Sequence, residues 1–166
     1  PYLITWPMKG ITGKKYLNIG GFGTHCLRGN NLAVQNADFI ISLGCRLDSR
    51  ATAKLDSFAR EAKIAMVDID NTEITKFDYF GKKIYFGLNM ELGAFFDAYQ
   101  SLVSYKIFET DSWINYLVEM KIKYNKVPDY THHAVNPYTA IQAISEHFKE
   151  EQFIVVDTGT CLPLTL

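Results

Sequence analysis

Residues 37–70 read ADFIISLGCRLDSRATAKLDSFAREAKIAMVDID, and this stretch decides the predicted fold. It holds two apolar runs, at 39–43 and 64–69, and each run ends in Gly, Arg or Asp. The runs are rich in Ile, Val and Phe and mostly lack the period-two alternation of a strand with one solvated face. This pattern predicts strands that are buried on both faces, as in a parallel sheet.

Working outward, similar apolar runs predict further strands at 2–5, 83–86 and 153–156. Segments of helical character lie between the strands, at 30–37, 53–60, 72–77 and 89–104. Alternation of strands and helices implies right-handed crossovers. The predicted fold class is α/β: a doubly wound, mostly parallel sheet with helices on both faces.

The C-terminal third has a different organisation. A helix is predicted at 109–126, and the polar, Pro-containing stretch VPDYTHHAVNP after it is typical of a linker. Asn136 suits a helix N-cap and Pro137 suits the first helical position. We therefore expect a new structural unit to begin there.

Charge and cysteine content narrow the function classes. Seventeen Lys and Arg against 18 Asp and Glu give a net charge of -1. The chain therefore has no broad positive electrostatic field that would attract nucleic acid or an anionic membrane. Three scattered Cys argue against a disulfide framework or zinc site and for a reducing compartment. No apolar run approaches the roughly 20 residues that cross a bilayer. We expect a cytoplasmic protein that binds neither nucleic acid nor membrane.

Polar residues cluster where the predicted strands end. Ligands of parallel sheets bind at the carboxyl ends of strands, where exposed amides and a cation suit a diphosphate and a carboxylate suits a ribose. The candidates are Gly20, Gly21, Gly23 and Gly29 before residue 37, Gly44, Arg46, Asp48 and Arg50 after the 39–43 run, and Asp68 and Asp70 after the 64–69 run. In the alternative interpretation the glycines serve turns, and Arg46 and Arg50 pair with Asp48 and Asp56.

Common nucleotide and metal motifs do not match. The GGFGTHC segment is not a G-x-G-x-x-G placed directly between strand and helix, and Asp68 lies far beyond the usual spacing of about 20 residues. In GITGKKYL, Lys15 occupies the Ser or Thr position of a P-loop. His132 and His133 lack further ligands at metal spacing, and adjacent His25 and Cys26 do not face one another usefully.

Three segments together resemble the thiamine diphosphate-dependent enzymes of the acetolactate synthase group: ITWPMKG, the run from GGFGTHC at residue 20 to VDIDNTEI, and NPYTAIQAI with FIVVDTGT. The resemblance implies most of a central domain over 1–105, lacking its first strand–helix unit. It implies a helix and linker over 106–134 and the truncated beginning of a diphosphate-binding domain over 135–166. Both ends of the chain are accordingly expected to be cut.

In flavin-containing members of that family the central domain holds FAD along these strand ends. Carried over by position, the cofactor-binding residues would be Gly20, Gly21, Phe22, Gly23, Gly44, Cys45, Arg46, Asp48, Arg50, Asp68 and Ile69. Leu88 stands where those members usually carry Asp, and some relatives keep the fold without flavin. A purely structural central domain is therefore the alternative to an FAD site.

The VDTGTC segment resembles the first loop of the diphosphate-binding domain. The resemblance implies that Thr158, Gly159, Thr160 and Cys161 approach thiamine diphosphate in the full-length enzyme. The G-D-G…N motif that holds Mg²⁺ is absent from the sequence, so we expect neither metal ligands nor catalytic residues in it. The resemblance further implies a 2-keto acid substrate, most often pyruvate, a homo-oligomeric full-length enzyme, and no turnover by these 166 residues alone.

Two rival functions remain open at this stage. One is a stand-alone nucleotide-binding module without catalysis, which the length of the natural reading frame would distinguish from a fragment. The other is an NAD-consuming deacylase, which usually needs a zinc-binding Cys quartet that three scattered Cys cannot supply.

Overall fold

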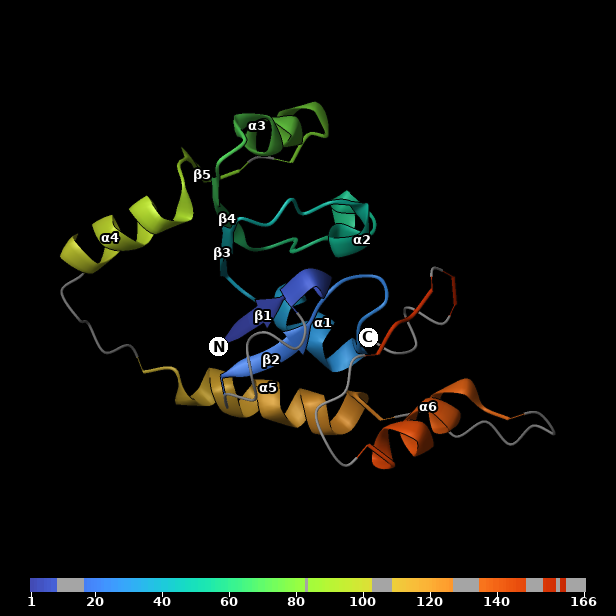
Figure 1. Ribbon diagram of the computed structural model, residues 1–166. Helices are drawn as coiled ribbons and strands as arrows, with labels where there is room; N and C mark the ends of the chain where they lie inside the picture. Colours follow the sequence, from blue (N-terminus) through green and yellow to red (C-terminus); the bar gives the residue numbers. More distant parts are fainter. Residues whose placement is uncertain are drawn as a thin grey trace.

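The fold contains two parallel sheets flanked by helices (Figure 1). The computed structural model describes residues 1–8, 17–82, 84–102, 109–126, 135–148, 154–157 and 159–160. Strand β1 (Tyr2–Ile4) pairs with β2 (Asn18–Gly21), and β3 (Phe39–Leu43), β4 (Lys63–Asp68) and β5 (Phe86–Asn89) form the second sheet in that order. Every pairing is parallel. The α/β fold class is thus confirmed.

Six α-helices lie in the described part of the chain: α1 (Arg28–Gln35), α2 (Ser49–Thr52), α3 (Asn71–Tyr79), α4 (Leu92–Leu102), α5 (Asp111–Tyr124) and α6 (Pro137–Glu146). Short 3-10 turns cover Trp6–Met8 and Leu55–Ser57. Helices α1 and α5 pack against each other and against β2, whereas α3 packs against β4 and β5. No helix in the described ranges is long and apolar enough to cross a membrane.

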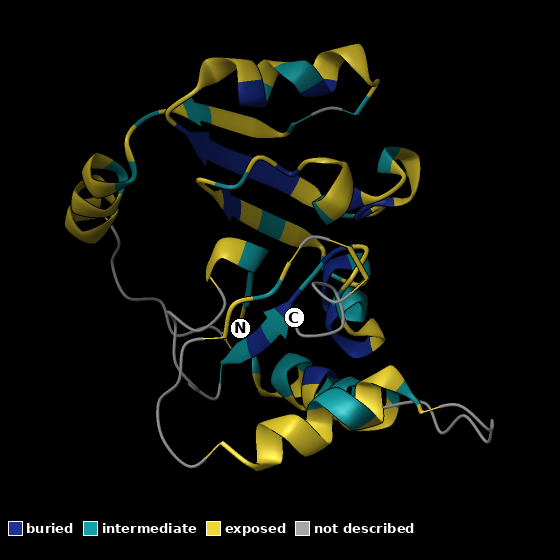
Figure 2. Ribbon diagram, turned by 45° about the vertical axis from the view of Figure 1, so that its right-hand side comes forward, coloured by how far each residue is buried: buried dark blue, intermediate teal, exposed yellow. Residues whose placement is uncertain are grey.

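The core is centred on β4, the middle strand of its sheet. Ile64, Met66 and Phe77 are almost fully buried and pack with Phe58 and Val34. A smaller cluster of Ile19, Ala33 and Leu117 lies between β2, α1 and α5. Figure 2 shows the buried residues concentrated in β4 and around α1. Neighbouring strands on both sides and burial of both faces explain why β4 is apolar from Ile64 to Val67.

Three features differ from the sequence-based prediction: strand β2, the strand expected at 83–86 and the helix expected at 53–60. The NIGG sequence of β2 carries two glycines, which are depleted in strands, so it was interpreted as a loop. The strand expected at 83–86 instead runs from Phe86 to Asn89, in register with Ala65–Asp68. The helix expected at 53–60 is wrong, because Asp48 caps an earlier helix that ends at Thr52, and Ala53 has a φ of 56°.

The far C-terminal region also differs from expectation. The described residues of the run at 153–156 form no strand, and Ile154 and Val155 are largely exposed. A strand needs a neighbour to satisfy its backbone, and none pairs with this run in the described part of the chain. The N-cap prediction is confirmed, since Asn136 Oδ1 accepts a hydrogen bond from the Tyr138 amide at 2.9 Å. The domain limits at 105 and 135 remain predictions.

Candidate functional site

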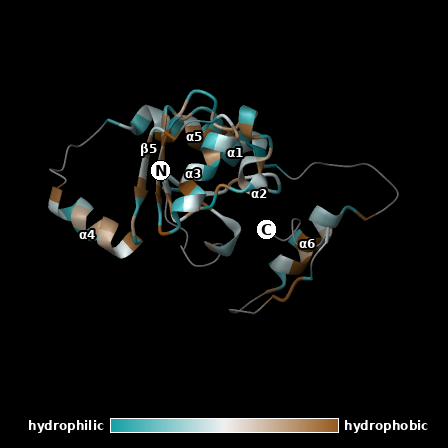
Figure 3. Ribbon diagram, turned by 90° about the horizontal axis from the view of Figure 1, so that it is seen from above, coloured by the Kyte–Doolittle hydropathy of each residue, from teal (hydrophilic) through white to brown (hydrophobic). Residues whose placement is uncertain are grey.

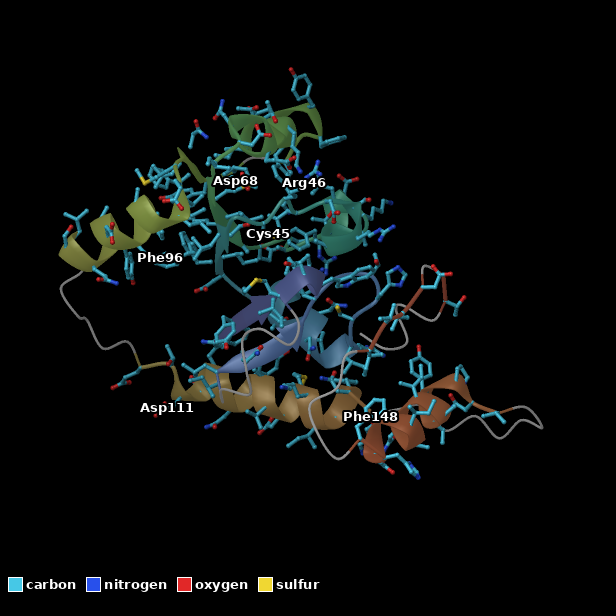
Figure 4. All side chains as sticks on the ribbon, viewed as in Figure 1. Cys45, Arg46, Asp68, Phe96, Asp111 and Phe148 are labelled. Carbon is cyan, nitrogen blue, oxygen red and sulfur yellow. The ribbon has the colours of Figure 1, made fainter. Side chains whose placement is uncertain are left out.

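The carboxyl ends of β3, β4 and β5 border a pocket of about 550 Å³. Parallel strands place these ends on one edge of the sheet, where ligands of such sheets bind. The lining residues are Gly44 and Arg46 after β3, Asp68, Ile69 and Asp70 at the end of β4, Glu73 on α3, and Met90, Glu91 and Leu92 between β5 and α4. Figure 4 shows Asp68 and Arg46 on the side of the sheet where α3 begins.

The end of β4 is fixed by two aspartates with structural contacts. Asp68 is buried, and its Oδ1 accepts a hydrogen bond from the Asp70 amide at 2.9 Å. Asp70 caps α3: its Oδ1 accepts from the Thr72 hydroxyl at 2.6 Å and from the Thr72 amide at 2.8 Å. These hydrogen bonds hold the pKa of Asp70 below its ordinary value. A carboxylate pair in this position can also accept hydroxyl groups from a ligand.

An ion-pair cluster forms a second wall. Arg46 Nε donates to Glu73 Oε1 at 2.8 Å, and Lys76 Nζ pairs with the other oxygen of Glu73. Lys76 also donates to the Arg46 carbonyl at 2.5 Å. The Arg46 side chain is 75% exposed and the Glu73 side chain only 12% exposed. Glu73 is thus buried beneath two cations, and the Arg46 guanidinium is already partly neutralised.

The third wall joins β5 to α4. Asn89 Nδ2 donates to the carbonyls of Asp68 and Ile69, at 3.1 and 2.7 Å. The Glu91 carboxylate accepts the Ala94 amide at 3.0 Å, and its bonds to the Gly93 and Ala94 amides lower the pKa of Glu91. Four carboxylates therefore line the pocket, and of the lining residues only Arg46 is basic. This charge balance favours hydroxyl or cationic groups over a diphosphate.

The glycine segment at 20–23 does not line this pocket. Gly20 and Gly23 both have a φ of 115°, which L side chains rarely adopt. A Cβ on Gly20 would lie 2.6 Å from Asn30 Nδ2, and a Cβ on Gly23 would lie 2.5 Å from the Arg50 carbonyl oxygen. Gly21 is buried in β2, and Phe22 packs against the core. Close packing within the protein therefore explains why glycines stand at 20 and 23.

The other residues predicted to bind a ligand after β3 make contacts within the protein. Asp48 caps α2 by accepting the Arg50 and Ala51 amides at 3.1 and 3.0 Å. The Arg50 guanidinium lies over the Trp6 ring, 5.4 Å from its centroid. Burial raises the pKa of the half-buried Cys45 thiol. Neither arginine forms the predicted pair with Asp48 or Asp56, since Arg46 pairs with Glu73 and Arg50 with Trp6.

Comparison with known proteins gives the family. Residues 1–82 match the model of the thiamine pyrophosphate enzyme central domain. Residues 1–82 thus belong to the thiamine pyrophosphate enzyme family. The chain is 32% identical over 143 residues to acetolactate synthase 1, chloroplastic, of Zea mays, covering 86% of the chain and 22% of that protein. It is 40% identical over 77 residues to the acetolactate synthase isozyme 1 large subunit of Escherichia coli K12, covering 46% and 14%.

A third relative is archaeal. The probable acetolactate synthase large subunit of Methanocaldococcus jannaschii is 28% identical over 137 residues, covering 81% of this chain and 22% of that protein. The chain therefore spans about a fifth of the length of the relatives it matches over most of its own length. The resemblance predicted from the sequence is confirmed.

The structure describes only part of the segment predicted to approach thiamine diphosphate. Gly159 and Thr160 are exposed, and Thr158 and Cys161 lie outside the described residues. Within the described ranges, no group of three or more His, Cys, Asp or Glu could hold a metal ion. We therefore derive no catalytic step through the cofactor from these residues.

Sequence reasoning missed part of the pocket. Glu73, Met90, Glu91 and Leu92 line it but were not among the predicted site residues. Their positions follow from helix starts: Glu73 lies in the first turn of α3, and Glu91 precedes α4. In parallel sheets the loop before each helix faces the strand ends, so the start of each predicted helix was the available signal.

Proposed function

We propose that these 166 residues are part of a longer thiamine diphosphate-dependent enzyme that decarboxylates or joins 2-keto acids, with pyruvate as the first substrate to test. The family match over residues 1–82 and the 32% identity to a plant acetolactate synthase over 143 residues support this proposal. The chain covers 22% of that relative, so catalysis would rest mainly on regions outside it. In the longer protein, thiamine diphosphate with Mg²⁺ would supply the carbanion chemistry.

In this proposal, residues 1–105 would help to position other parts of the longer protein and would not take part in the reaction. Among their described residues, no group of three or more His, Cys, Asp or Glu could hold a metal ion. The 166 residues alone should accordingly show no turnover. The proposal also includes a homo-oligomeric full-length enzyme, which the sequence resemblance implies. It further includes a cytoplasmic location, which the cysteine content favours.

We propose that the pocket accepts the ribose of a nucleotide, and FAD is one nucleotide to test, although the four carboxylates disfavour its diphosphate within the pocket itself. The free oxygens of Asp68 and Asp70 would accept ribose hydroxyls, and Ile69, which is 74% exposed, offers an apolar contact for a base. A diphosphate would meet an Arg46 guanidinium that Glu73 already partly neutralises through its Nε. A purely structural central domain, without any bound nucleotide, is the alternative.

Two measurements on the purified full-length protein test these proposals separately. Thiamine diphosphate with Mg²⁺ should raise the thermal unfolding midpoint, since a ligand at 100 times its Kd stabilises by about 2.7 kcal/mol. Thiamine monophosphate serves as the control and should stabilise less. An absorbance band at roughly 450 nm would support FAD, and its absence would favour the structural alternative. Stabilisation by nucleotides but not by thiamine diphosphate would contradict the proposed enzyme function. It would favour a nucleotide-binding module without catalysis.

A further inference from the structure

One carboxylate oxygen in the pocket at the ends of β3, β4 and β5 has no partner among the described residues. Asp68 is only 7% exposed, and its Oδ1 accepts the Asp70 amide at 2.9 Å, whereas its Oδ2 accepts no hydrogen bond there. No fully buried side-chain oxygen or nitrogen of the described residues lacks a partner, so Oδ2 keeps some contact with open space. That space is the pocket, which Asp68 lines.

The two helix starts at this edge of the sheet are occupied by carboxylates of the protein itself. Helix N-termini bind phosphate through free backbone amides. At the start of α3, Asp70 Oδ1 accepts the Thr72 amide at 2.8 Å. At the start of α4, Glu91 Oε2 accepts the Ala94 amide at 3.0 Å. A phosphate group at either helix start would therefore lie against a carboxylate.

The other donors of the pocket are engaged as well. The Gly44 amide, directly after β3, donates to the Val67 carbonyl at 2.8 Å. Arg46 Nε donates to Glu73 Oε1 at 2.8 Å, and the Arg46 side chain is 75% exposed. Four carboxylates thus face one exposed and partly neutralised cation among the residues that line the pocket.

We infer that the pocket selects a phosphate-free nucleoside over its 5′-diphosphate and over FAD. This inference rests on the proposed binding of a ribose and specifies which ribose compounds fit. The hydroxyl groups of a ribose are neutral donors, and a carboxylate such as that of Asp68 is an acceptor for them. A diphosphate is an anion, and the carboxylates of the pocket would repel it. The disagreement between this charge pattern and the diphosphate of FAD carries the inference.

An apolar wall of the pocket suits the base of a nucleoside. Ile69 is 74% exposed, and Met90 and Leu92 line the pocket between β5 and α4. Figure 3 shows the hydrophobic colour gathered in the strands and along parts of α4, whose first residue is Leu92. The volume of about 550 Å³ falls in the range of small-molecule pockets, roughly 300–1,000 Å³. Since Ile69 directly follows Asp68, one nucleoside can contact both residues.

Isothermal titration of the full-length protein with adenosine, AMP, ADP and FAD tests the inference. Affinity should fall with each added phosphate, and ADP and FAD should bind at least about tenfold more weakly than adenosine. 2′-Deoxyadenosine should also bind more weakly than adenosine, because it lacks one hydroxyl that Asp68 would accept. ADP or FAD binding as tightly as adenosine would overturn the inference and leave the thiamine diphosphate proposal standing.

A charge variant separates electrostatic repulsion from a poor steric fit. Glu91→Gln keeps an oxygen that can accept the Ala94 amide but removes one negative charge, so the affinity for ADP relative to adenosine should rise at least about threefold. Glu119→Gln, on the exposed side of α5, is the matched control and should leave this ratio unchanged. An unchanged ratio in Glu91→Gln would overturn the electrostatic basis of the selectivity.

Thermal stabilisation by thiamine diphosphate with Mg²⁺ is measured on the same protein and distinguishes the possible failures. Stabilisation by thiamine diphosphate without any binding of adenosine would overturn the inference and favour the purely structural central domain. Binding of adenosine over ADP without stabilisation by thiamine diphosphate would support the inference and contradict the proposed enzyme.

Discussion

Arg46 Nε lies 2.8 Å from Glu73 Oε1, and this ion pair links the loop after β3 to the first turn of α3 at the mouth of the pocket. The pair holds the pocket's basic group against a carboxylate that is itself buried. A phosphate-containing ligand would therefore meet an Arg46 whose charge Glu73 already partly offsets. The same pair also gives a first test of how the site is built.

Replacing each partner of this pair should have unequal effects on stability. Glu73→Gln should lower the free energy of unfolding by about 1–3 kcal/mol, because Gln has no negative charge and only one oxygen that can accept from Arg46 and Lys76. Arg46→Ala should cost less than about 1 kcal/mol, because its exposed side chain is screened by water. Urea denaturation measures both, with Glu119→Gln on the exposed side of α5 as the control. A larger loss for Arg46→Ala than for Glu73→Gln would contradict the assigned geometry.

Gly23 should tolerate no side chain. Gly23→Ala should cost at least about 2 kcal/mol, because its Cβ would lie 2.5 Å from the Arg50 carbonyl oxygen in addition to the strain of a φ of 115°. Gly81→Ala is the matched control: Gly81 has a φ of 70° with no atom within 4 Å of the added Cβ, so only about 1 kcal/mol of strain is expected. Equal urea midpoints for the two variants would show that the close approach to Arg50 does not matter.

Asp70 should make stability depend on pH in the acid range. Its folded pKa lies below its ordinary value of 3.8, so its contribution is present above that value and is lost as pH falls through the folded pKa. Asp70→Asn keeps an N-cap acceptor without the charge, so its urea midpoint should fall less than that of the wild type from about pH 5 to pH 3. Parallel curves for wild type and Asp70→Asn would count against this cap.

Asn125 should stabilise the packing of the C-terminal end of α5 against α1. Its Oδ1 accepts the Gly29 amide at 2.8 Å, and its Nδ2 donates to Asn30 Oδ1 at 2.8 Å. Asn30 in turn donates to the Gly21 carbonyl at 3.0 Å. Asn125→Ala should lower the free energy of unfolding by roughly 1–3 kcal/mol, because it leaves buried groups of α1 without partners. Asn36→Ala, which removes one exposed hydrogen bond, should cost less; an equal loss would refute the role of Asn125.

The strands of the second sheet were the most predictable part of the fold. Apolar runs mark both β3 and β4. Burial on both faces, expected for both strands, holds for β4, whereas alternate residues of β3 are exposed. β2 escaped prediction because its two glycines are held by contacts with distant residues, Gly20 by Asn30 for example. Such packing is a tertiary effect that local propensity does not encode.

The pocket was predictable in part for the same reason. Gly44, Arg46, Asp68 and Ile69 follow strands that the sequence marks clearly, and the parallel topology brings them together. Glu73 and Glu91 were missed because their place in the pocket depends on where α3 and α4 begin, which hydrogen bonds to Asp70 and Glu91 determine. Gly20 to Gly23 were expected beside the ligand, but their contacts lie with Asn30, Asn31 and Arg50.

We propose that this chain is part of a thiamine diphosphate-dependent enzyme acting on 2-keto acids. The most direct test is pyruvate consumption by the purified full-length protein, measured with and without added thiamine diphosphate and Mg²⁺. We expect consumption that requires both additions and is absent from the 166-residue chain. A full-length protein that consumes neither pyruvate nor any other 2-keto acid under these conditions would contradict the claim.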